Sequence, residues 1–323
     1  MSGVDVLVVS VDSTSGWRAA TRELVASLSR AGATVAVAAT APLPRVRTFA
    51  LTDLVEARAA RHACQRGIEE HDPAAVIYCS ITAALLWPRP GAIWLDSLAA
   101  DNRPGRHGVW QRSVERRRLE QAPLILAMSP RALGAARTAR PIEVVPVPVD
   151  RSGSARSARD VDAIAYAGNP AKKRLDYVLS AWSTARHGDE TLVVAGLDRL
   201  EAVPGVELAG RLDPAEYRAL LRRARVFAAA PLREDYGIAP LEALADGCQL
   251  VTTPAPGPYP ALEIARRLDP RLVGEDLVTG LRTALDDPLP DYAERASKLL
   301  EPFSPRAVDQ TVAERVLPRL LSR

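Results

Sequence analysis

Two glutamates, Glu234 and Glu242, stand eight positions apart in a stretch that also contains Gly237. Apolar runs at 225–230 and 249–253 enclose this stretch, so the pattern predicts a strand, a loop, a helix and a second strand. Gly237 allows close approach of the backbone to a ligand, and the N–H groups at the start of a helix attract an anion. Ionised carboxylates only accept hydrogen bonds. The combination therefore suits a ligand with both phosphates and hydroxyls, such as a sugar nucleotide.

Each of these residues, taken alone, also fits a structural role. Pro240 suits the first helical turn, where its missing N–H is not needed. Glu242 is expected near the third helical position, where glutamate is common for reasons of capping and of the helix dipole. Glu234 and Asp235 fit solvated loop charges. The functional interpretation depends on the ordered set and not on one residue.

The length and composition of the chain limit its class. At 323 residues it exceeds one typical core and predicts two domains of roughly 150 residues each. A hydrophobic fraction of 47% and a charged fraction of 25% are typical of soluble globular proteins, and a net charge of +3 is too small to indicate nucleic acid. No apolar run approaches the roughly 20 residues that span a bilayer, and no signal pattern is visible, so a cytoplasmic location is expected. Three isolated cysteines without metal-ligand spacing are expected to be buried apolar residues: Cys64, Cys79 and Cys248.

Short β-branched runs alternate with helical patterns in both halves of the chain, which predicts parallel sheets covered by helices on both faces. The expected fold class is α/β, with two Rossmann-like domains facing a cleft. The domains are expected at 1–150 and 151–305, with the polar stretch 151–157 as the linker. A C-terminal helix within 306–323 is expected to pack back toward the first domain.

The individual elements follow from the same periodicity. In the first half the strands are expected at 4–11, 34–39, 75–79, 92–95, 124–128 and 142–147, and the helices at 17–30, 54–70, 109–121 and 130–138. In the second half the pattern predicts strands at 163–167, 191–195 and 206–208 and helices at 175–185, 214–223 and 307–321.

Residues 225–252 resemble the corresponding segment of the GT-B glycosyltransferases, specifically the large retaining group classed as family 4. Glu234 and Glu242 match the Glu-seven residues-Glu motif of that family, in the same strand–loop–helix context. Upstream, 166–176 resembles its Gly-Arg…Lys-Gly-x-Asp element, and 206–212 resembles the strand before its small helix. The resemblance covers most of the chain and is specific in the C-terminal half and diffuse in the first.

The resemblance implies roles for these residues. In that family the first glutamate contacts sugar hydroxyls and the second binds the ribose of the nucleotide, which implies these roles for Glu234 and Glu242. Backbone N–H groups around Tyr236, Gly237 and Ile238 are implied to hold the diphosphate.

The lysine of the family matches Lys173, which is implied to neutralise the charge that grows on the departing diphosphate. Lys172 is its neighbour, and one further lysine, Lys298, completes the lysines of the chain, so the pair suggests a site that needs a compact point charge. Gly168 belongs to the same element and is a donor-binding candidate. Gly16, in the loop before the first helix, resembles the family's glycine after strand one, and a simple turn explains it equally well.

Three positions depart from the family pattern. Asn169 stands where the family has arginine, which leaves Lys172 or Arg174 to replace it, or leaves the diphosphate more loosely held. Arg174 itself replaces a glycine. The family's His-Asp pair at the end of an N-domain strand appears as Leu95 and Asp96, so the histidine is missing. Asp96 is the first domain's candidate for contact with the acceptor or the transferred sugar, and N-capping of the next segment is its structural alternative.

The implied reaction is transfer of a hexosyl group from a nucleotide-diphosphate sugar to an acceptor hydroxyl, with retention of anomeric configuration and without a metal or another cofactor. The acceptor stays open between a glycan, a lipid-linked molecule and a small molecule. A non-catalytic nucleotide-binding subunit and a nucleotide-sugar epimerase on the same fold are the alternatives.

The segment 103–118 is basic and contains Trp110. It fits contact with an anionic acceptor or with the inner face of a membrane, which would make the protein a peripheral one. A solvated helix face is the alternative, since arginine is abundant throughout the chain.

Overall fold

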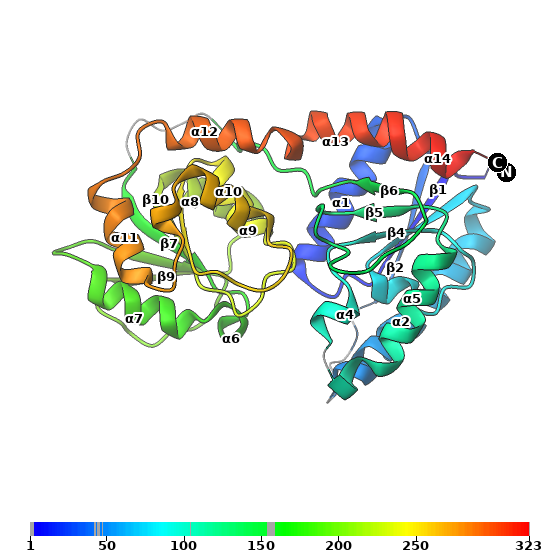
Figure 1. Cartoon of the computed structure of the whole chain (residues 1–323), viewed down its shortest axis with the longest axis horizontal. Helices are drawn as coiled ribbons and strands as arrows, with labels where there is room; N and C mark the ends of the chain where they lie inside the picture. The colour runs from blue at the N-terminus through cyan, green and yellow to red at the C-terminus, as the bar shows by residue number, and fades with distance from the viewer. Residues whose placement is uncertain are drawn as a thin grey trace. The chain divides into compact units, whose positions relative to one another are not determined.

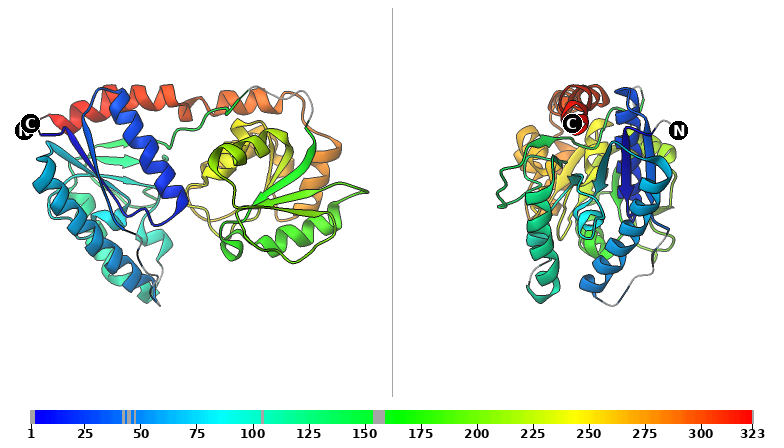
Figure 2. Two further views of the ribbon diagram at one scale, coloured as in Figure 1. Left: turned by 180° about the vertical axis from the view of Figure 1, so that it is seen from behind. Right: turned by 90° about the vertical axis from the view of Figure 1, so that its right-hand side faces the viewer.

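The chain forms two compact units. The computed structural model describes residues 3–41, 43, 46, 48–103, 105–153 and 159–322. The first unit joins Met1–Pro148 to Phe303–Arg323, and the second is Val149–Pro302. Each unit is a parallel β-sheet covered by helices (Figure 1; Figure 2), which confirms the α/β class with two Rossmann-like units.

The sheet of the first unit has six parallel strands: β1 (Val6–Ser10), β2 (Val35–Ala39), β3 (Ala75–Cys79), β4 (Ala92–Leu95), β5 (Ile125–Ala127) and β6 (Ile142–Val144). Their order is β2-β1-β3-β4-β5-β6. The chain therefore runs from β1 outward to β2 and returns to β3 on the other side of β1. The carboxyl ends of β1 and β3 form the topological switch point of this sheet, the place where open α/β sheets bind ligands.

Helices of very different length cover this sheet: α1 (Ser15–Arg30), α2 (Phe49–His71), α3 (Ile81–Ala84), α4 (Ala99–Asn102), η1 (Gly105–Gly108) and α5 (Val109–Gln121). Strands β1, β3 and β4 are buried at every position, as expected for strands covered on both faces. Trp94 in β4 is fully buried, and its indole N–H donates to the carbonyl oxygen of Val145 at 2.8 Å. This bond satisfies the one polar group of a large core side chain.

The C-terminal segment packs on the first unit. It consists of α13 (Pro305–Thr311), a π-helical turn η4 (Val312–Val316) and α14 (Leu317–Leu321). Asp309 accepts hydrogen bonds from Arg30 Nε at 2.6 Å and from the hydroxyl of Ser27 on α1. Arg319 pairs with Glu143, a buried carboxylate of β6. The expectation that the C-terminal helix packs on the N-terminal domain is therefore confirmed.

The sheet of the second unit has five parallel strands: β7 (Val161–Tyr166), β8 (Leu192–Ala195), β9 (Val206–Gly210), β10 (Ala224–Ala229) and β11 (Gln249–Thr252). Their order is β11-β10-β7-β8-β9. The chain moves from β7 to β8 and β9 and then crosses back to place β10 on the other side of β7. The switch point of this sheet therefore lies at the carboxyl ends of β7 and β10.

The helices of the second unit are α6 (Pro170–Lys173), α7 (Leu175–Ala185), α8 (Pro214–Arg223), α9 (Ile238–Ala245), α10 (Pro260–Leu268), η2 (Pro270–Leu272), α11 (Leu277–Asp286) and α12 (Tyr292–Leu299), with η3 (Glu301–Phe303) at the boundary. Helix α8 begins with a capping box, in which Asp213 and Glu216 each accept a hydrogen bond from the other's backbone N–H. The strands and helices expected between 163 and 223 are present within a few residues. Helix α10 was not expected.

The helix expected at 130–138 is wrong. Residues 130–135 form successive turns, in which an N–H bonds to a carbonyl three residues before it, as from Gly134 to Arg131 at 3.0 Å. Gly134 has a φ of +53°, a left-handed conformation that a right-handed helix cannot continue through. The apolar pattern there reflects burial of Leu133 in the core of the first unit.

The three cysteines are buried and free, as expected. Within the described ranges, no helix combines the length and the apolar character needed to cross a membrane. The stretch expected as a linker is described only at 151–153, and residues 154–157 lie outside the described part of the chain. Ser152 is held by hydrogen bonds from its amide and hydroxyl to the carboxylate of Asp246 (2.8 and 2.9 Å).

Candidate functional site

Two loops meet at the switch point of the second unit. One follows β7 and contains α6, and the other follows β10 and spans 230–237. The amide of Leu232 in the second loop donates to the carbonyl oxygen of Lys172 in the first at 2.9 Å, which joins them. A pocket opens between the loops, and its lining includes Tyr166, Lys173, Pro231, Glu234 and Pro240. Two of the predicted site residues thus share a pocket where parallel α/β sheets bind ligands.

Lys173 and Glu234 form an ion pair in this pocket, with the ammonium of Lys173 donating to Oε2 of Glu234. The side chain of Glu234 is 8% exposed and that of Lys173 is 21% exposed. The amide of Glu234 donates to the carbonyl oxygen of Pro256 at 3.0 Å, which fixes the glutamate loop from its other side. Breaking a shielded pair of this kind is costly, because it leaves one buried charge without a partner.

The short helix α6 explains two departures from the family pattern. The side chain of Asn169 accepts a hydrogen bond from the amide of Lys172 at 3.1 Å, so this residue caps the helix. Arg174 ends the helix in the left-handed conformation (φ 49°, ψ 51°), in which glycine is the usual residue. Its guanidinium lies 4.4 Å from the ring centre of Tyr177, a cation–π contact. The side chain of Lys172 is exposed.

Gly168 provides the space between β7 and α6. A Cβ at this position would lie 2.6 Å from the hydroxyl oxygen of Tyr166. Gly196, after β8, is equally close, since its Cβ would lie 2.9 Å from the Tyr166 ring and 3.0 Å from the amide nitrogen of Gly168. The ring of Tyr166 therefore packs between two loop glycines, and any larger residue would push the loop away from it.

Gly237 shapes the entry to α9. Its φ is +81°, and an added Cβ would lie 3.0 Å from Cγ of Glu234 and 3.2 Å from the ring of Tyr259. No side chain accepts a hydrogen bond at this N-cap, so the N–H groups of the first turn, beginning with Ile238, suit an anion. Tyr236 is buried just before it. Tyr259 is fully buried, and burial raises the pKa of its hydroxyl, which lies 3.0 Å from Oγ1 of Thr252.

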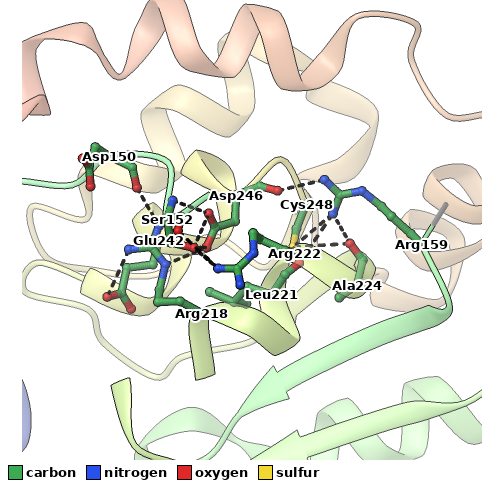
Figure 3. A network of polar contacts seen from close by, with 10 residues as sticks. All are labelled: Asp150, Ser152, Arg159, Arg218, Leu221, Arg222, Ala224, Glu242, Asp246 and Cys248. Carbon is green, nitrogen blue, oxygen red and sulfur yellow. Dashed lines mark hydrogen bonds and ion pairs between the residues drawn. The ribbon is translucent and has the colours of Figure 1, made fainter. Parts of the chain in front are cut away.

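Glu242 is the fifth residue of α9, not the third, so the capping role considered for it is wrong. Its carboxylate lies 3.8 Å from Arg218 Nη1 on α8, and its side chain is 24% exposed. Burial raises the pKa of Glu242 to about 7, Arg218 opposes that rise, and the negative Asp246 adds to it. Arg218 belongs to a wider polar network that ends at Asp150 and Cys248 (Figure 3).

Sequence reasoning missed Arg218 and Tyr259. Arg218 stands in an amphipathic helix among other arginines, where nothing local distinguishes it from a solvated charge. Tyr259 precedes Pro260 in a stretch without a recognisable pattern. A residue whose partner is distant in sequence becomes visible only when the fold joins them. The position of α8 beside α9 is therefore the signal for Arg218.

Asp96 and Gly16 belong to the first unit. Asp96 follows β4 and is half-buried, and it does not cap the next helix: the N-cap of α4 is Leu98. The carboxylate of Glu115 accepts the bonds there instead, from the amides of Ala99 (2.6 Å) and Ala100 (3.4 Å). The capping alternative for Asp96 is therefore wrong. Gly16 is the second residue of α1, which Thr14 caps, and its φ is not positive.

Much of the basic segment 103–118 is held by contacts within the first unit. Arg103 pairs with the buried Asp53 at 3.1 Å. Arg112 donates to the carbonyl oxygen of Arg103 at 2.5 Å, and Arg118 lies 4.9 Å from the ring centre of Trp87. Arg116 and Arg117 are exposed. Pro104, and the side chains of Arg106 and His107, lie outside the described part of the segment.

The described residues contain no group of three or more His, Cys, Asp and Glu side chains placed to hold a metal ion. The positive groups of the site come from side chains and from backbone N–H groups. Among the described residues they include Lys173, Arg218 and the first turn of α9.

Comparison with known proteins gives a family match for the second unit and the fold of the chain. Residues 162–301 match the family model described as glycosyl transferases group 1. The chain is similar in structure to WaaG, a glycosyltransferase involved in lipopolysaccharide biosynthesis (TM-score 0.70, 15% identity, 97% of this chain and 99% of that one). It is also similar to Anabaena HepE in complex with UDP and glucose (TM-score 0.67, 14% identity, 96% of this chain and 98% of that one). A third similar structure is sucrose-phosphate synthase from Thermosynechococcus elongatus (TM-score 0.65, 14% identity, 96% of this chain and 98% of that one).

No curated protein sequence matches the chain. The structural likenesses cover nearly the whole chain at low identity, so they establish the fold, and the family match covers most of the second unit. The second unit therefore matches the glycosyl transferases group 1 model, and the two Rossmann-like units have the GT-B fold.

Proposed function

We propose that the chain transfers a sugar from a nucleoside-diphosphate sugar to an acceptor hydroxyl, with retention of anomeric configuration and without a metal ion. The observation that carries the proposal is the contact of Lys173 with Glu234 at the switch point of the second unit. The match of residues 162–301 to the glycosyl transferases group 1 model supports the class of reaction. Retention rests on the resemblance of the Glu234 and Glu242 motif to family 4 enzymes.

Lys173 is the residue we place at the diphosphate. When the bond from the anomeric carbon to the diphosphate breaks, negative charge grows on the departing oxygen. An ammonium in a shielded pocket stabilises that charge more strongly than it would in water. The first turn of α9 adds backbone N–H groups and the positive end of a helix dipole. Together these groups supply the positive charge that a divalent metal ion would otherwise bring.

Glu234 and Glu242 are the residues we place at the hydroxyls of the donor. A carboxylate only accepts hydrogen bonds and a hydroxyl donates one, so each glutamate suits a sugar ring. Glu234 lies against Lys173 and is therefore placed beside the diphosphate, at the transferred sugar. Glu242 is four residues beyond Ile238 along α9, a rise of about 6 Å. This separation suits a nucleotide whose ribose lies about one helical turn beyond its phosphates along α9.

The first unit is where we place the acceptor. Asp96 is the candidate for contact with the acceptor or with the transferred sugar, because it directly follows β4, a central strand of the first sheet. Gly16 is the candidate for close approach of α1 to the donor phosphates or to the acceptor. The test begins with the donor.

The test is a panel of nucleotide sugars, with UDP-glucose first because the similar HepE structure holds UDP and glucose. Guanosine, adenosine and thymidine diphosphate sugars complete it. A bound donor raises the melting temperature, since a ligand stabilises the state that binds it. We expect slow release of nucleoside diphosphate in water, unchanged in EDTA, and a product with the anomeric configuration of the donor.

Each other outcome contradicts a defined part of the proposal. Binding without transfer or hydrolysis across the panel indicates a non-catalytic nucleotide-binding subunit. A changed sugar on an intact nucleotide indicates an epimerase. An inverted product contradicts retention, and loss of activity in EDTA contradicts metal independence.

A further inference from the structure

The guanidinium of Arg218 lies beside Glu242 and contacts three negative or polar groups. Arg218 Nε donates to Oδ2 of Asp246 at 2.6 Å, and its Nη2 donates to the carbonyl oxygen of Asp150 at 2.6 Å. The remaining nitrogen, Nη1, faces Oε1 of Glu242 at 3.8 Å. Figure 3 shows the guanidinium of Arg218 among these groups. Its planar fork is thus held by two short bonds while the third arm points to the glutamate.

The two short bonds are well shielded. The side chain of Arg218 is 14% exposed and that of Asp246 is fully buried. Asp246 also accepts hydrogen bonds from the amide and the hydroxyl of Ser152, so its carboxylate is fixed from two sides. Arg222, one turn further along α8, donates to the same hydroxyl of Ser152. The groups that anchor the arginine beside Glu242 are not among the described residues that line the pocket of Lys173.

We propose that Arg218 is a positioning residue for the nucleotide: it holds Glu242 as an oriented carboxylate, so that the site binds a ribose in preference to a sugar without its hydroxyls. This inference rests on the proposed function, because it takes Glu242 as the ribose ligand. Only an ionised carboxylate offers both oxygens as acceptors to two neighbouring hydroxyls. A hydrogen bond to a charged acceptor is about twice as strong as one between neutral groups.

The surroundings of Glu242 make its ionisation dependent on Arg218. Burial raises the pKa of Glu242 to about 7, Arg218 lowers it, and Asp246 raises it. The phenol of Tyr217 on α8, also buried, lies near enough for Glu242 to raise its pKa, after the larger effect of burial. Below pH 7 the carboxyl gains a proton and loses acceptor capacity. The preference for ribose should therefore rise with pH through about 7.

The experiment compares UDP with its 2′,3′-dideoxy form by calorimetry between pH 5.5 and 8.5, using the full chain. If UDP does not bind, the same pair of guanosine or adenosine diphosphates is used. The ratio of the two affinities isolates the ribose hydroxyls, because the phosphates titrate alike in both ligands. We expect the ratio to be at least about tenfold above pH 7 in the wild type and to be lost in Glu242→Gln.

Arg218→Met should remove most of the preference at pH 7 and move the pH midpoint of the ratio upward, since the group that favours the carboxylate is gone. Asp246→Asn should move the midpoint downward, because a negative neighbour is removed. Arg218→Lys, which keeps the charge, should keep the midpoint near that of the wild type. Arg218→Met with Asp246→Asn avoids a buried unpaired carboxylate, in case the single variant does not fold.

Arg223→Met is the matched control, since Arg223 lies on the same helix and pairs with Asp160 in an exposed ion pair at 2.8 Å. It should leave the ratio and the midpoint unchanged. The inference is overturned if Glu242→Gln abolishes the ratio while the Arg218 and Asp246 variants keep both the ratio and the midpoint of the wild type. Failure of the proposed function has a different signature, namely no binding of any of these nucleotides to the wild-type protein.

Discussion

The loop that follows β1 in the first unit and the loop that follows β7 in the second stand at equivalent places in two similar sheets. After β1, the hydroxyl of Ser10 donates to Asp12 at 2.6 Å and lies 3.0 Å from the hydroxyl of Thr21. After β7, Lys173 pairs with Glu234 across a pocket. One switch point thus consists of hydroxyls around a carboxylate, and the other contains a cation.

The backbone is strained beside both switch points. Non-glycine residues have positive φ at Asp12 (52°) and Ser80 (107°) in the first unit and at Arg174 (49°) and Tyr259 (31°) in the second. The second switch point also has Gly237 (81°), where the backbone can approach a ligand closely. The two places therefore differ mainly in their side chains, and the pocket with Lys173 is the one suited to a charged ligand.

The largest expected effect comes from removing the ammonium group of Lys173 in the second unit. Lys173→Ala should lower kcat about 100- to 1,000-fold, because a group that stabilises the leaving charge acts in the transition state. Single-turnover rates with saturating donor separate this loss from weaker binding. Lys298→Ala, an exposed lysine on α12, is the control and should keep wild-type turnover. Full activity of Lys173→Ala would contradict the role given to this lysine.

A smaller effect is expected from a Cβ at Gly237. Gly237→Ala should reduce the free energy of unfolding by about 2–3 kcal/mol, because alanine is strained at this φ and its Cβ meets Glu234. Gly32→Ala in the first unit is matched, with a φ of +94° and open space around the added Cβ. Gly32→Ala should reduce the free energy of unfolding by about 1–2 kcal/mol and leave nucleotide affinity unchanged. Gly237→Ala should weaken nucleotide binding.

Urea unfolding measures the two stabilities, and nucleotide titration measures the affinities. Equal losses in the two variants, with equal affinities, would show that left-handed backbone alone matters and that the contact of Gly237 with Glu234 does not shape the site.

The charged switch point was more predictable from the sequence than the other. Glu234, Gly237 and Glu242 lie within one loop and one helix, so their spacing in the chain is close to their spacing in space. Lys173 came from a second local pattern, and the fold placed it against Glu234. The alternation of strands and helices predicted both sheets, because continuous apolar strands have few alternatives to burial on two faces.

The remainder depended on contacts between distant segments. Arg218 acts through Glu242, and Glu115 caps a helix on another part of the first unit, and no local pattern marks such pairs. The helix expected at 130–138 failed because the positive φ of Gly134 overrides the apolar periodicity there. A glycine's φ depends on its surroundings, so the pattern alone could not reveal it.

A buried carboxylate of the first unit, Glu115, provides a third prediction, with an expected effect on stability of similar size. Burial raises the pKa of Glu115 to about 7, although the hydrogen bonds from the amides of Ala99 and Ala100 lower this pKa in part. The folded state therefore binds more protons than the unfolded state between about pH 4.5 and 7, so this group's contribution to stability is lost as the pH rises through that window.

Glu115→Gln does not titrate, so its stability relative to the wild type should improve by about 2 kcal/mol as the pH rises through that window. Urea unfolding at pH 4.5, 6 and 8 measures the difference. A difference that is the same at every pH would contradict the raised pKa of Glu115.

The smallest effect tests the strained backbone of the first switch point. Ser80 has φ 107° and ψ 154°, a region that only glycine occupies readily, and its side chain caps α3 by accepting from the amide of Ala83 at 3.2 Å. Ser80→Gly relieves the strain. It also removes the capping side chain, but glycine at an N-cap costs only a few tenths of a kcal/mol relative to serine. It should therefore stabilise the protein by about 1 kcal/mol, seen as a higher melting temperature, and leave nucleotide affinity unchanged. Destabilisation, or weaker nucleotide binding, would contradict the contrast between the units, because glycine should help at the first switch point while alanine harms the second.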